Sequence, residues 1–281
     1  MISGLRHYNA AALVVSNRKI RFLWDFAMFE VSDRSRRFGG IARLYGTGVA
    51  DALARAHVCL VGIGGVGSWA AEALARSGIG ALTLIDPDNV AVSNTNRQIH
   101  ALTPTFGQAK TAAMRERIAA INPDCRVCEV EDFADEQNLP ELLSPPFDFV
   151  IDAIDQVRVK AALAAHCVRT GKPLAVSGGA GGQRHPSLIR SGDLASVTHD
   201  RLLANMRYLL RRHHGFARAG AGKMGVWCVY SSENVVAPQT ESCDAAPQGL
   251  SCAGYGASML VTAAFGLHLA HAAVEHIATT A

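Results

Sequence analysis

Short apolar runs alternate along the chain with longer stretches whose apolar residues recur at helical spacing. The runs have the length and composition of buried strands, and the stretches between them are typical of helices that pack on a sheet. Repeated strand–helix units predict an α/β fold with a mostly parallel sheet, right-handed crossovers and helices on both faces. The predicted strands are Val58–Val61, Leu82–Ile85, Arg126–Val130, Phe149–Asp152 and Leu174–Ser177, and the helices are Ser68–Ser77, Gln108–Ile121, Glu136–Leu143 and Val157–Thr170.

The alternation stops after the glycine-rich residues 178–182, and the remaining chain predicts an antiparallel and helical extension. We therefore expect one domain over residues 35–281, with 183–281 as its substrate-binding and dimerisation portion. Residues 1–34 are expected to be an N-terminal extension. The C-terminal portion is predicted to contain a basic helix at Asp200–His213, a basic glycine-rich loop at Gly215–Gly225, a strand at Val226–Ser231, a turn-rich loop at Pro238–Gly249 and an apolar helix within Gly254–Ile277.

A glycine-rich turn joins the first predicted strand to the first predicted helix. It has the form G-x-G-x-x-G in the strand–turn–helix–strand context that nucleotide-binding folds require, so the α/β fold is expected to be Rossmann-like. Glycines let the backbone approach phosphates, and the helix N-terminus offers unpaired N–H groups. An acidic residue about 20 positions later can accept hydrogen bonds from ribose hydroxyls. The predicted nucleotide contacts in this unit are Gly62, Gly64, Gly65, Gly67, Asp86 and Asp88.

A polar cluster soon after the second strand points to nucleotidyl transfer rather than hydride transfer. Arg97 can contact phosphate oxygens in a bidentate manner, and Lys110 can supply a compact positive charge to a polyphosphate. Asn94 and Gln98 are predicted to help hold the nucleotide. The alternative is an ordinary loop whose charged side chains are merely solvated, and spacing alone does not exclude it.

Asp155 follows the fourth predicted strand, at the sheet edge that faces the ligand crevice in open α/β folds. There it can hold Mg²⁺ against phosphate oxygens, so we predict Asp155 as a metal-binding and catalytic residue. Asp152 lies within the strand and is expected to be structural. The alternative for Asp155 is a helix N-cap for the helix that follows.

Composition adds limits rather than a function. The 281 residues are 49% hydrophobic and 18% charged, which suits a globular core, and the net charge of +3 requires that any nucleic-acid contact be a local patch. The seven cysteines are expected to be free thiols in a reducing cytoplasm. The first residues lack the continuous apolar core that a secretory signal requires, so no such signal is expected. The C-terminal apolar stretch is expected to pack on the sheet, with membrane association as the alternative.

Together these motifs resemble the ubiquitin-activating-enzyme-like adenylating family, which includes the adenylating enzymes of molybdenum-cofactor and thiamin biosynthesis. The resemblance implies binding of Mg-ATP and adenylation of a carboxylate. It implies that Asp86 contacts the ribose, that Asn94, Arg97 and Lys110 contact ATP, and that Asp155 is a magnesium-associated catalytic acid. The matching segments are RFGGIARLYG, GIGGVGSWAAEALARSGIG, LIDPDNV, NTNRQIHA, GQAK and VIDAIDQVRVKAAL.

Three further segments, SGGAGGQ, GKMGVWCVYSSE and SCAGYGASMLVTAAFG, resemble the tRNA-modifying branch of this family. That branch closes a ring in threonylcarbamoyladenosine of tRNA through an acyl-adenylate. The resemblance implies a homodimer, a cysteine-desulfurase or sulfur-acceptor partner, ATP and Mg²⁺, and a monovalent cation as a further candidate. Lysine and arginine over the basic helix and loop can track tRNA phosphates, although a solvated helix face is the alternative. The predicted tRNA contacts are Arg207, Arg211, Arg212, Arg218 and Lys223.

The chain departs from the protein-activating relatives in two ways. Gly40 stands where an arginine reaches the partner's ATP in those relatives, which leaves Arg37 or Arg43 as substitutes or no such finger. The zinc-binding cysteine pairs of some relatives are missing, so we expect no structural zinc. Cys228 and Cys252 are expected to be small apolar residues rather than acyl acceptors. The runner-up function is adenylation of a ubiquitin-like or sulfur-carrier protein, and an NAD-dependent oxidoreductase or a non-catalytic nucleotide-binding module comes third.

Overall fold

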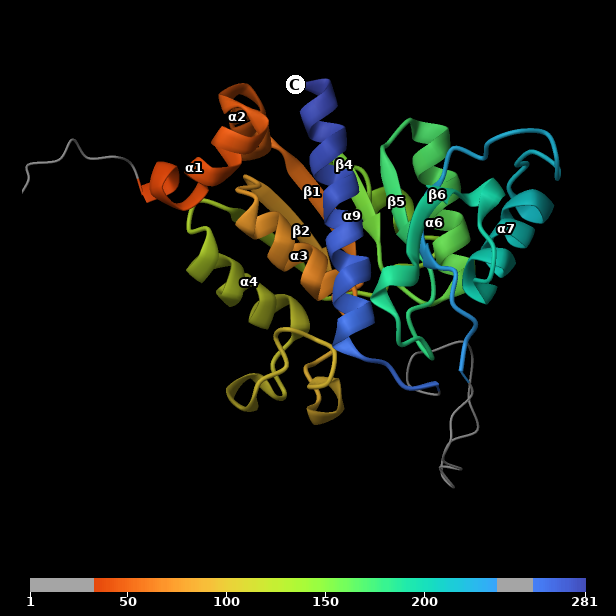
Figure 1. The fold of residues 1–281 in the computed structure, drawn as a ribbon, viewed down its shortest axis with the longest axis horizontal. Helices are drawn as coiled ribbons and strands as arrows, with labels where there is room; N and C mark the ends of the chain where they lie inside the picture. The colour runs from red at the N-terminus through yellow and green to blue at the C-terminus, as the bar shows by residue number, and fades with distance from the viewer. Residues whose placement is uncertain (1–32, 237–254) are drawn as a thin grey trace, which may run out of the picture. The chain divides into compact units, whose positions relative to one another are not determined.

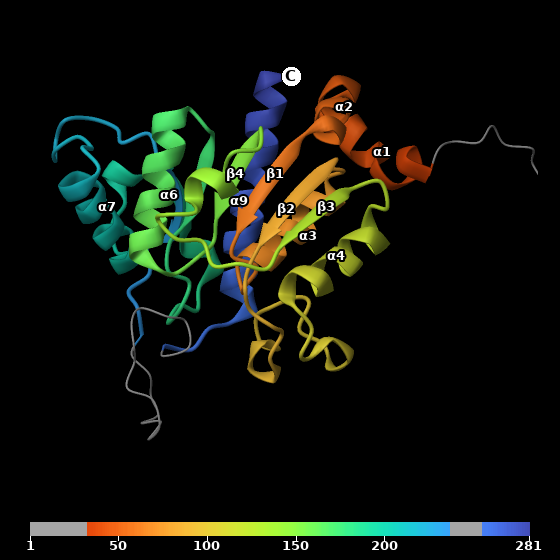
Figure 2. The same ribbon diagram turned by 180° about the vertical axis from the view of Figure 1, so that it is seen from behind.

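The computed structural model describes residues 33–236 and 255–281, which contain a seven-stranded sheet with helices on both faces (Figures 1 and 2). The strand order is β3-β2-β1-β4-β5-β7-β6. The strands are β1 (His57–Val61), β2 (Ala81–Ile85), β3 (Arg126–Val130), β4 (Phe149–Asp152), β5 (Leu174–Ser177), β6 (Ile189–Asp193) and β7 (Trp227–Ser231). The helices are α1 (Asp33–Tyr45), α2 (Thr47–Arg55), α3 (Gly67–Arg76), α4 (Lys110–Ile121), α5 (Leu139–Leu142), α6 (Val157–Thr170), α7 (Arg201–His213) and α9 (Met259–Thr280).

The sheet is parallel except at one edge, which confirms the predicted fold class. β1 lies at the centre between β2 and β4, and every residue of β2 and β4 is buried. Continuous apolar runs of this kind are typical of strands covered on both faces. β6 pairs antiparallel with β7 and was not predicted. Its sequence, IRSGD, is mostly polar because it forms the edge of the sheet, so no apolar run marks it.

Two apolar cores lie on opposite faces of the sheet. One is built from α2, α3, α4 and α9, and the other from α5, α6 and α7. α9 packs most extensively on α3, and a Cβ atom on Gly266 would collide with the carbonyl oxygen of Val66. This close approach explains a glycine within a long apolar helix. α9 is long and apolar enough to cross a membrane by length and composition, and in this structure its buried side chains join the core.

Some predicted boundaries were wrong, and local hydrogen bonding explains them. The α5 helix spans only Leu139–Leu142 rather than Glu136–Leu143, because the Asp135 carboxylate accepts hydrogen bonds from the backbone N–H groups of Gln137 and Asn138 and closes a turn there. The α4 helix begins at Lys110 rather than Gln108, whose carbonyl oxygen accepts a hydrogen bond from Val90. The helices α1 and α2 were not predicted, and the predicted loop at Pro238–Gly249 lies outside the described residues.

Candidate nucleotide site

A cavity of about 270 Å³ opens at the carboxyl ends of the central strands. In a parallel sheet these ends meet at one edge, so loops far apart in sequence are brought together there. Nine of the eleven residues predicted to bind the nucleotide line the cavity: Gly62, Gly64, Gly65, Asp86, Asp88, Arg97, Gln98, Lys110 and Asp155. Gly67 and Asn94 lie outside the lining. These assignments concern contacts with a ligand, and they stay predictions.

The glycine turn is held in a conformation that only glycine adopts easily. Gly62 has φ of 90°, and its N–H group donates a hydrogen bond to the carbonyl oxygen of Ile85 (2.8 Å). A Cβ atom on Gly67 would overlap the carbonyl oxygen of Gly62, so Gly67 is required to close the turn rather than to line the cavity. α3 begins at Gly67, which directs the positive end of the helix dipole toward the cavity.

Asp86 is buried and fastens the glycine turn to the end of β2. Its carboxylate accepts hydrogen bonds from the backbone N–H groups of Ile63 (2.6 Å) and Asp88 (3.0 Å). One oxygen also lies 3.5 Å from the ammonium nitrogen of Lys110. The predicted ribose contact is thus also a structural residue of the turn, because it satisfies backbone donors on two loops.

Lys110 presents a positive charge at the cavity wall. Its side chain is almost fully buried, and its ammonium group lies 2.7 Å from the exposed carboxylate of Asp88. Burial of an ammonium group is costly unless carboxylates or phosphates surround it. The lysine is therefore held by two aspartates and stands where phosphate oxygens could share its charge.

The loop that carries Arg97 is held by the residues around it. The indole N–H of Trp69 donates to the carbonyl oxygen of Arg97 (2.9 Å), and the Arg97 guanidinium donates to the Ser93 carbonyl oxygen (2.8 Å). The buried Asn94 side chain accepts a hydrogen bond from the N–H group of Ala91 (3.0 Å). Asn94 therefore stabilises the loop, and the structure does not place its side chain in the cavity. Gln98, by contrast, has a buried amide oxygen with no partner among the described residues.

Asp155 is exposed at the cavity and forms no hydrogen bond or ion pair with any other described residue. The N-cap of α6 is Gln156, and no side chain caps that helix. The N-cap alternative for Asp155 is therefore wrong. A free carboxylate at the phosphate-binding edge has the right oxygen chemistry for Mg²⁺, which usually takes one or two protein carboxylates together with phosphates and water. Among the described residues no group of three histidine, cysteine or acidic side chains is arranged to hold a metal by itself.

A fully buried ion pair lies beneath this turn. The ammonium group of Lys160 is 2.8 Å from the Asp152 carboxylate, and neither side chain is exposed. The same carboxylate oxygen accepts a hydrogen bond from the N–H group of Ile154 (3.1 Å), within the turn that leads to Asp155. Burial raises the pKa of Asp152, while the adjacent Lys160 charge opposes that shift. Sequence reasoning missed Lys160 because a lysine within VRVKAAL is typical of a solvated helix face.

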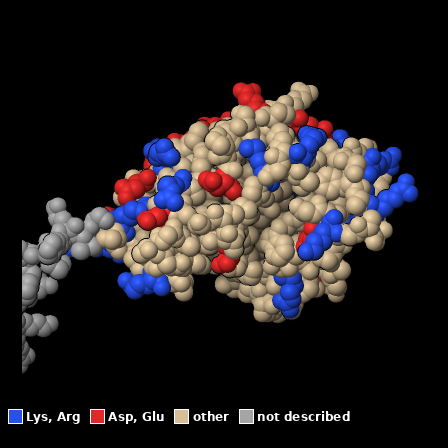
Figure 3. All heavy atoms as spheres, turned by 90° about the horizontal axis from the view of Figure 1, so that it is seen from above, with Lys and Arg blue, Asp and Glu red and all other residues tan. Residues whose placement is uncertain are grey.

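The predicted tRNA-binding residues differ in whether their side chains already have partners within the protein. The Arg207 guanidinium donates to the carbonyl oxygens of Leu194 (2.9 Å) and Val197 (2.8 Å), which gives it a structural role. Arg211 and Lys223 line a groove of about 950 Å³ that also contains the half-exposed Trp227. Figure 3 shows lysine and arginine side chains on the end of the molecule that α7 and the following loop form. Arg212 lies over the Tyr208 ring, and Arg218 and Lys223 are exposed in the loop.

Four of the five described cysteines, Cys59, Cys125, Cys167 and Cys228, are poorly suited to acyl transfer, because burial raises the pKa of each thiol. Cys228 is completely buried, and burial raises the pKa of its thiol well above the usual range. The prediction that the chain lacks C-x-x-C pairs is wrong, because Cys125 and Cys128 form one such pair, and burial raises the pKa of Cys125 to about 11. Cys252 lies outside the described residues.

Arg37 and Arg43, the two candidates for an arginine that reaches the ATP of a partner subunit, both contact residues of their own chain. Arg37 is 2.6 Å from the Asp33 carboxylate and donates to the carbonyl oxygen of Ile121 (3.1 Å) at the end of α4. The Arg43 guanidinium lies beside Gly39 on its own helix. Within one chain, Arg37 therefore joins α1 to α4.

A parallel α/β sheet with a glycine turn, two cationic side chains and a free carboxylate around one cavity defines a phosphate-binding nucleotide site. The family model for the ThiF family matches residues 38–274, and the chain belongs to that family. It is 50% identical over 261 residues to the tRNA threonylcarbamoyladenosine dehydratase of Escherichia coli, covering 89% of this chain and 97% of that one. It is 44% identical over 241 residues to the enzyme of that name from Haemophilus influenzae, covering 85% of this chain and 92% of that one.

A solved structure is similar over the same length. The crystal structure of the Escherichia coli tRNA N6-threonylcarbamoyladenosine dehydratase in complex with ATP superposes with a TM-score of 0.81 at 49% identity. The match covers 89% of this chain and 98% of that one. The likeness therefore extends beyond the glycine turn to the C-terminal third of the chain.

Proposed function

We propose that the protein uses ATP to cyclise threonylcarbamoyladenosine in tRNA, with the loss of one water from the nucleoside. The observation that carries this proposal is the cavity in which Arg97, Lys110 and Asp155 converge on a glycine turn. Similarity over nearly the whole chain to enzymes named for this reaction supports the substrate. We also propose one adenylating domain over residues 35–281, with 183–281 as its tRNA-binding and dimerisation portion.

The first step is adenylation of the threonyl carboxylate. A carboxylate oxygen attacks the α-phosphorus of ATP, an O–P bond forms, and the bond to pyrophosphate breaks. Arg97 and Lys110 stabilise the negative charge that builds up on the phosphate oxygens, and α3 adds the positive end of its dipole. A carboxylate is a poor acyl donor, and the acyl-adenylate makes it reactive.

The second step closes the ring within the substrate. A nitrogen or oxygen of the carbamoyl group attacks the acyl carbon, AMP leaves with the former carboxylate oxygen, and one proton is released. Because nucleophile and acyl carbon belong to one molecule, positioning supplies much of the acceleration. The protein's main tasks are to orient the substrate and to exclude water. A cysteine nucleophile is not needed, which agrees with the buried state of Cys228.

The Asp155 carboxylate has the chemistry to hold Mg²⁺ at this site, and the ion would offset negative charge at the reacting phosphorus. The free Asp155 carboxylate supports this assignment. Replacing Asp155 with Asn keeps the size of the side chain and removes its charge. We expect the Mg²⁺ concentration for half-maximal rate to rise at least tenfold while ATP-free stability is unchanged. An unaltered Mg²⁺ requirement would assign the ion to phosphates alone.

The partners follow from the same proposal. Arg211, Arg212, Arg218 and Lys223 are proposed to contact tRNA phosphates, whereas Arg207 supports the loop beneath them. A homodimer, a cysteine-desulfurase or sulfur-acceptor partner and a monovalent cation are proposed from the family. A cytoplasmic location is proposed as well, with α9 as the element through which membrane contact would occur.

The second candidate is adenylation of a small carrier protein, which the shared ATP site favours equally. One experiment separates the two. The protein is incubated with ATP, Mg²⁺ and tRNA whose threonylcarbamoyladenosine carries ¹⁸O in the carboxylate. Loss of one water from the nucleoside and transfer of one ¹⁸O atom to AMP would support cyclisation. Release of ADP and phosphate, or pyrophosphate exchange that depends on a carrier protein instead of tRNA, would overturn it.

A further inference from the structure

A second cavity of about 250 Å³ adjoins the nucleotide site. Gly179 and Leu202 line both cavities, so these residues form a wall that the two spaces share. Ligand cavities usually measure about 300–1,000 Å³, so this one suits part of a ligand whose remainder lies elsewhere. Its lining residues are Gly179, Gly181, Gln183, His199, Asp200, Arg201, Leu202, Val235 and Tyr255.

Gln183 gives this cavity an unused hydrogen-bond acceptor. The side chain is 4% exposed, and its amide oxygen has no partner among the described residues. A buried carbonyl oxygen without a donor is unfavourable by about 1–3 kcal/mol in a folded protein. A ligand that brings an N–H donor to this oxygen would satisfy it.

His199 adds a second sign of a functional surface. It is the one non-glycine residue in the described ranges with a positive φ, 62°. Residues held in this left-handed region store strain, and they cluster at ligand sites. His199 directly precedes Asp200, whose carboxylate accepts hydrogen bonds from Gly179 (2.9 Å) and Leu203 (2.9 Å). The strained residue is thus fixed to the wall between the two cavities.

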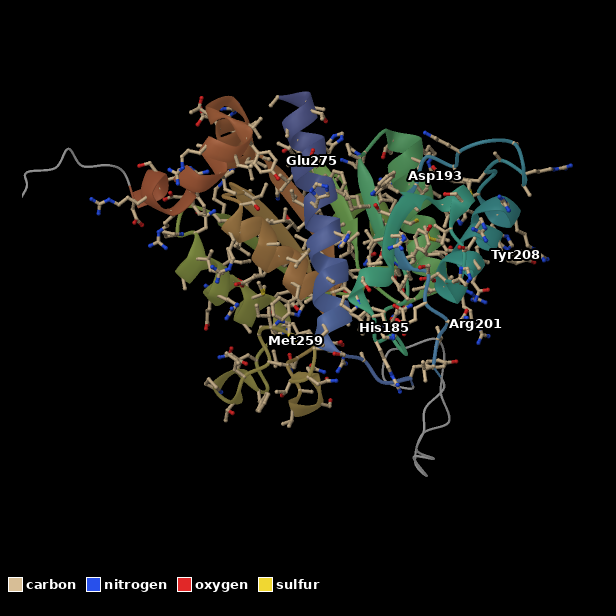
Figure 4. All side chains as sticks on the ribbon, viewed as in Figure 1. His185, Asp193, Arg201, Tyr208, Met259 and Glu275 are labelled. Carbon is tan, nitrogen blue, oxygen red and sulfur yellow. The ribbon has the colours of Figure 1, made fainter. Side chains whose placement is uncertain are left out.

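The rim of the cavity supplies a charge and an aromatic ring. Arg201 is exposed at the start of α7, and Figure 4 shows it along the same lower edge as His185 and Met259. Tyr255 is half-buried and offers a ring that can pack on a planar base. A buried acceptor, an aromatic ring and an exposed cation together match a modified purine nucleoside that arrives on a phosphate backbone.

We propose that this second cavity holds the carbamoyl-bearing base of the substrate, and the inference rests on the proposed function. The urea N–H of the base donates to Gln183, the purine packs on Tyr255, and Arg201 contacts a flanking phosphate. The threonyl carboxylate then extends past Gly179 into the nucleotide cavity. This arrangement places the carboxylate beside the nucleotide cavity, because Gly179 and Leu202 line both spaces.

The test compares Gln183→Met, which keeps the side-chain length but removes the acceptor, with Tyr255→Leu and the matched control Tyr255→Phe. We expect Gln183→Met to raise the KM for modified tRNA by tenfold or more, and Tyr255→Leu to raise it by about tenfold. Tyr255→Phe retains the ring and should keep the KM for modified tRNA within twofold of the wild-type value. The Kd for ATP should stay at the wild-type value in all three, and the melting temperature should not fall; Gln183→Met should raise it, because it removes the unpaired buried oxygen.

Two results would overturn the proposal. One is an unchanged KM for modified tRNA in Gln183→Met, and the other is an equal loss of ATP affinity, which would mean that Gln183 only supports the fold. A separate arm measures binding of free N6-threonylcarbamoyladenosine by NMR with AMP present. If the wild-type protein fails to cyclise tRNA but binds this nucleoside, and Gln183→Met does not bind it, the proposed reaction fails while the cavity assignment stands. Absence of nucleoside binding by the wild type would overturn the assignment.

Discussion

Two buried lysines with aspartate partners lie near the nucleotide-binding edge, and they illustrate different uses of a buried charge. Lys110 faces the cavity. Of its two partners, Asp86 also accepts a hydrogen bond from the backbone, and Asp88 is exposed to solvent. Lys160 and Asp152 pair with each other without any exposure, and the Asp152 carboxylate also accepts a hydrogen bond from the N–H group of Ile154. A charge that faces a cavity can exchange its partners for a ligand. A charge sealed in the core can only hold the backbone around it.

Removing the sealed lysine should have the largest effect. Lys160→Met leaves Asp152 buried without its cation, and uncompensated buried charges of this kind destabilise proteins by roughly 3–5 kcal/mol. We expect the melting temperature to fall by many degrees in calorimetry. The control is the double variant Lys160→Met with Asp152→Leu, which removes both charges and should recover most of the loss. A single variant as stable as the wild type would show that the pair contributes no net stability.

His100 extends the comparison to pH, because its ring is buried beside Lys110 and both ring nitrogens lack partners among the described residues. Burial, then the Lys110 and Arg117 charges, lower its pKa to about 4 from 6.5. Between pH 6.5 and pH 4, His100 is protonated in the unfolded chain and neutral in the folded chain. The free energy of unfolding therefore falls as the pH is lowered through this range. The loss is about 3 kcal/mol at pH 4.

His100→Leu should remove that part of the acid sensitivity, whereas His213→Leu on α7 should leave it unchanged. Equilibrium urea unfolding at pH 7 and pH 4.5 measures the difference. Equal pH dependence in the wild type and His100→Leu would mean that the ring is protonated in the folded state.

Lys110→Met should raise the pKa of His100 toward its usual range, since it removes the second cause of the shift.

Lys110→Met should separate function from stability. Asp86 keeps its hydrogen bonds from Ile63 and Asp88, and Asp88 is exposed, so the loss of stability should stay below about 1 kcal/mol. The rate of ATP-dependent adenylation should fall by about 10²–10³, as expected when one group that stabilises developing charge is removed. Pyrophosphate release in single turnover measures it. A large fall in melting temperature would instead place Lys110 with Lys160 as a structural residue.

The same contrast explains what the sequence could predict. The glycine turn, Arg97, Lys110 and Asp155 could be predicted to share one cavity, which they line, because nucleotide chemistry requires these residue types at a fixed spacing. Lys160, Gln183 and the edge strand β6 were missed, because burial of a polar residue depends on neighbours that are distant in sequence or on the other face of a helix. Asn94 was predicted at the ligand but caps its own loop, a distinction that spacing alone does not reveal.

The smallest effects are expected at the surface, where charges have neither a cavity nor a core around them. Arg211→Ala with Arg212→Ala should raise the KM for tRNA by about tenfold at roughly 150 mM salt and leave the Kd for ATP unchanged. Removal of one phosphate-binding charge should reduce the slope of log K against log salt by roughly 1, so the double variant should reduce it by about 2. The control is Arg190→Ala. It removes a positive charge from β6, the edge strand of the sheet, and leaves α7 unchanged.

If the control changes the slope by half as much as the double variant, which is the same change per charge removed, tRNA senses only the net charge of the protein. A change confined to Arg211 and Arg212 would instead assign tRNA binding to α7. Salt is the discriminating variable because it screens exposed charges strongly and screens a pair sealed in the core, like Lys160 and Asp152, much less. The salt dependence of tRNA binding should therefore come from α7, while the stability that Lys160 and Asp152 contribute should stay the same from low to high salt.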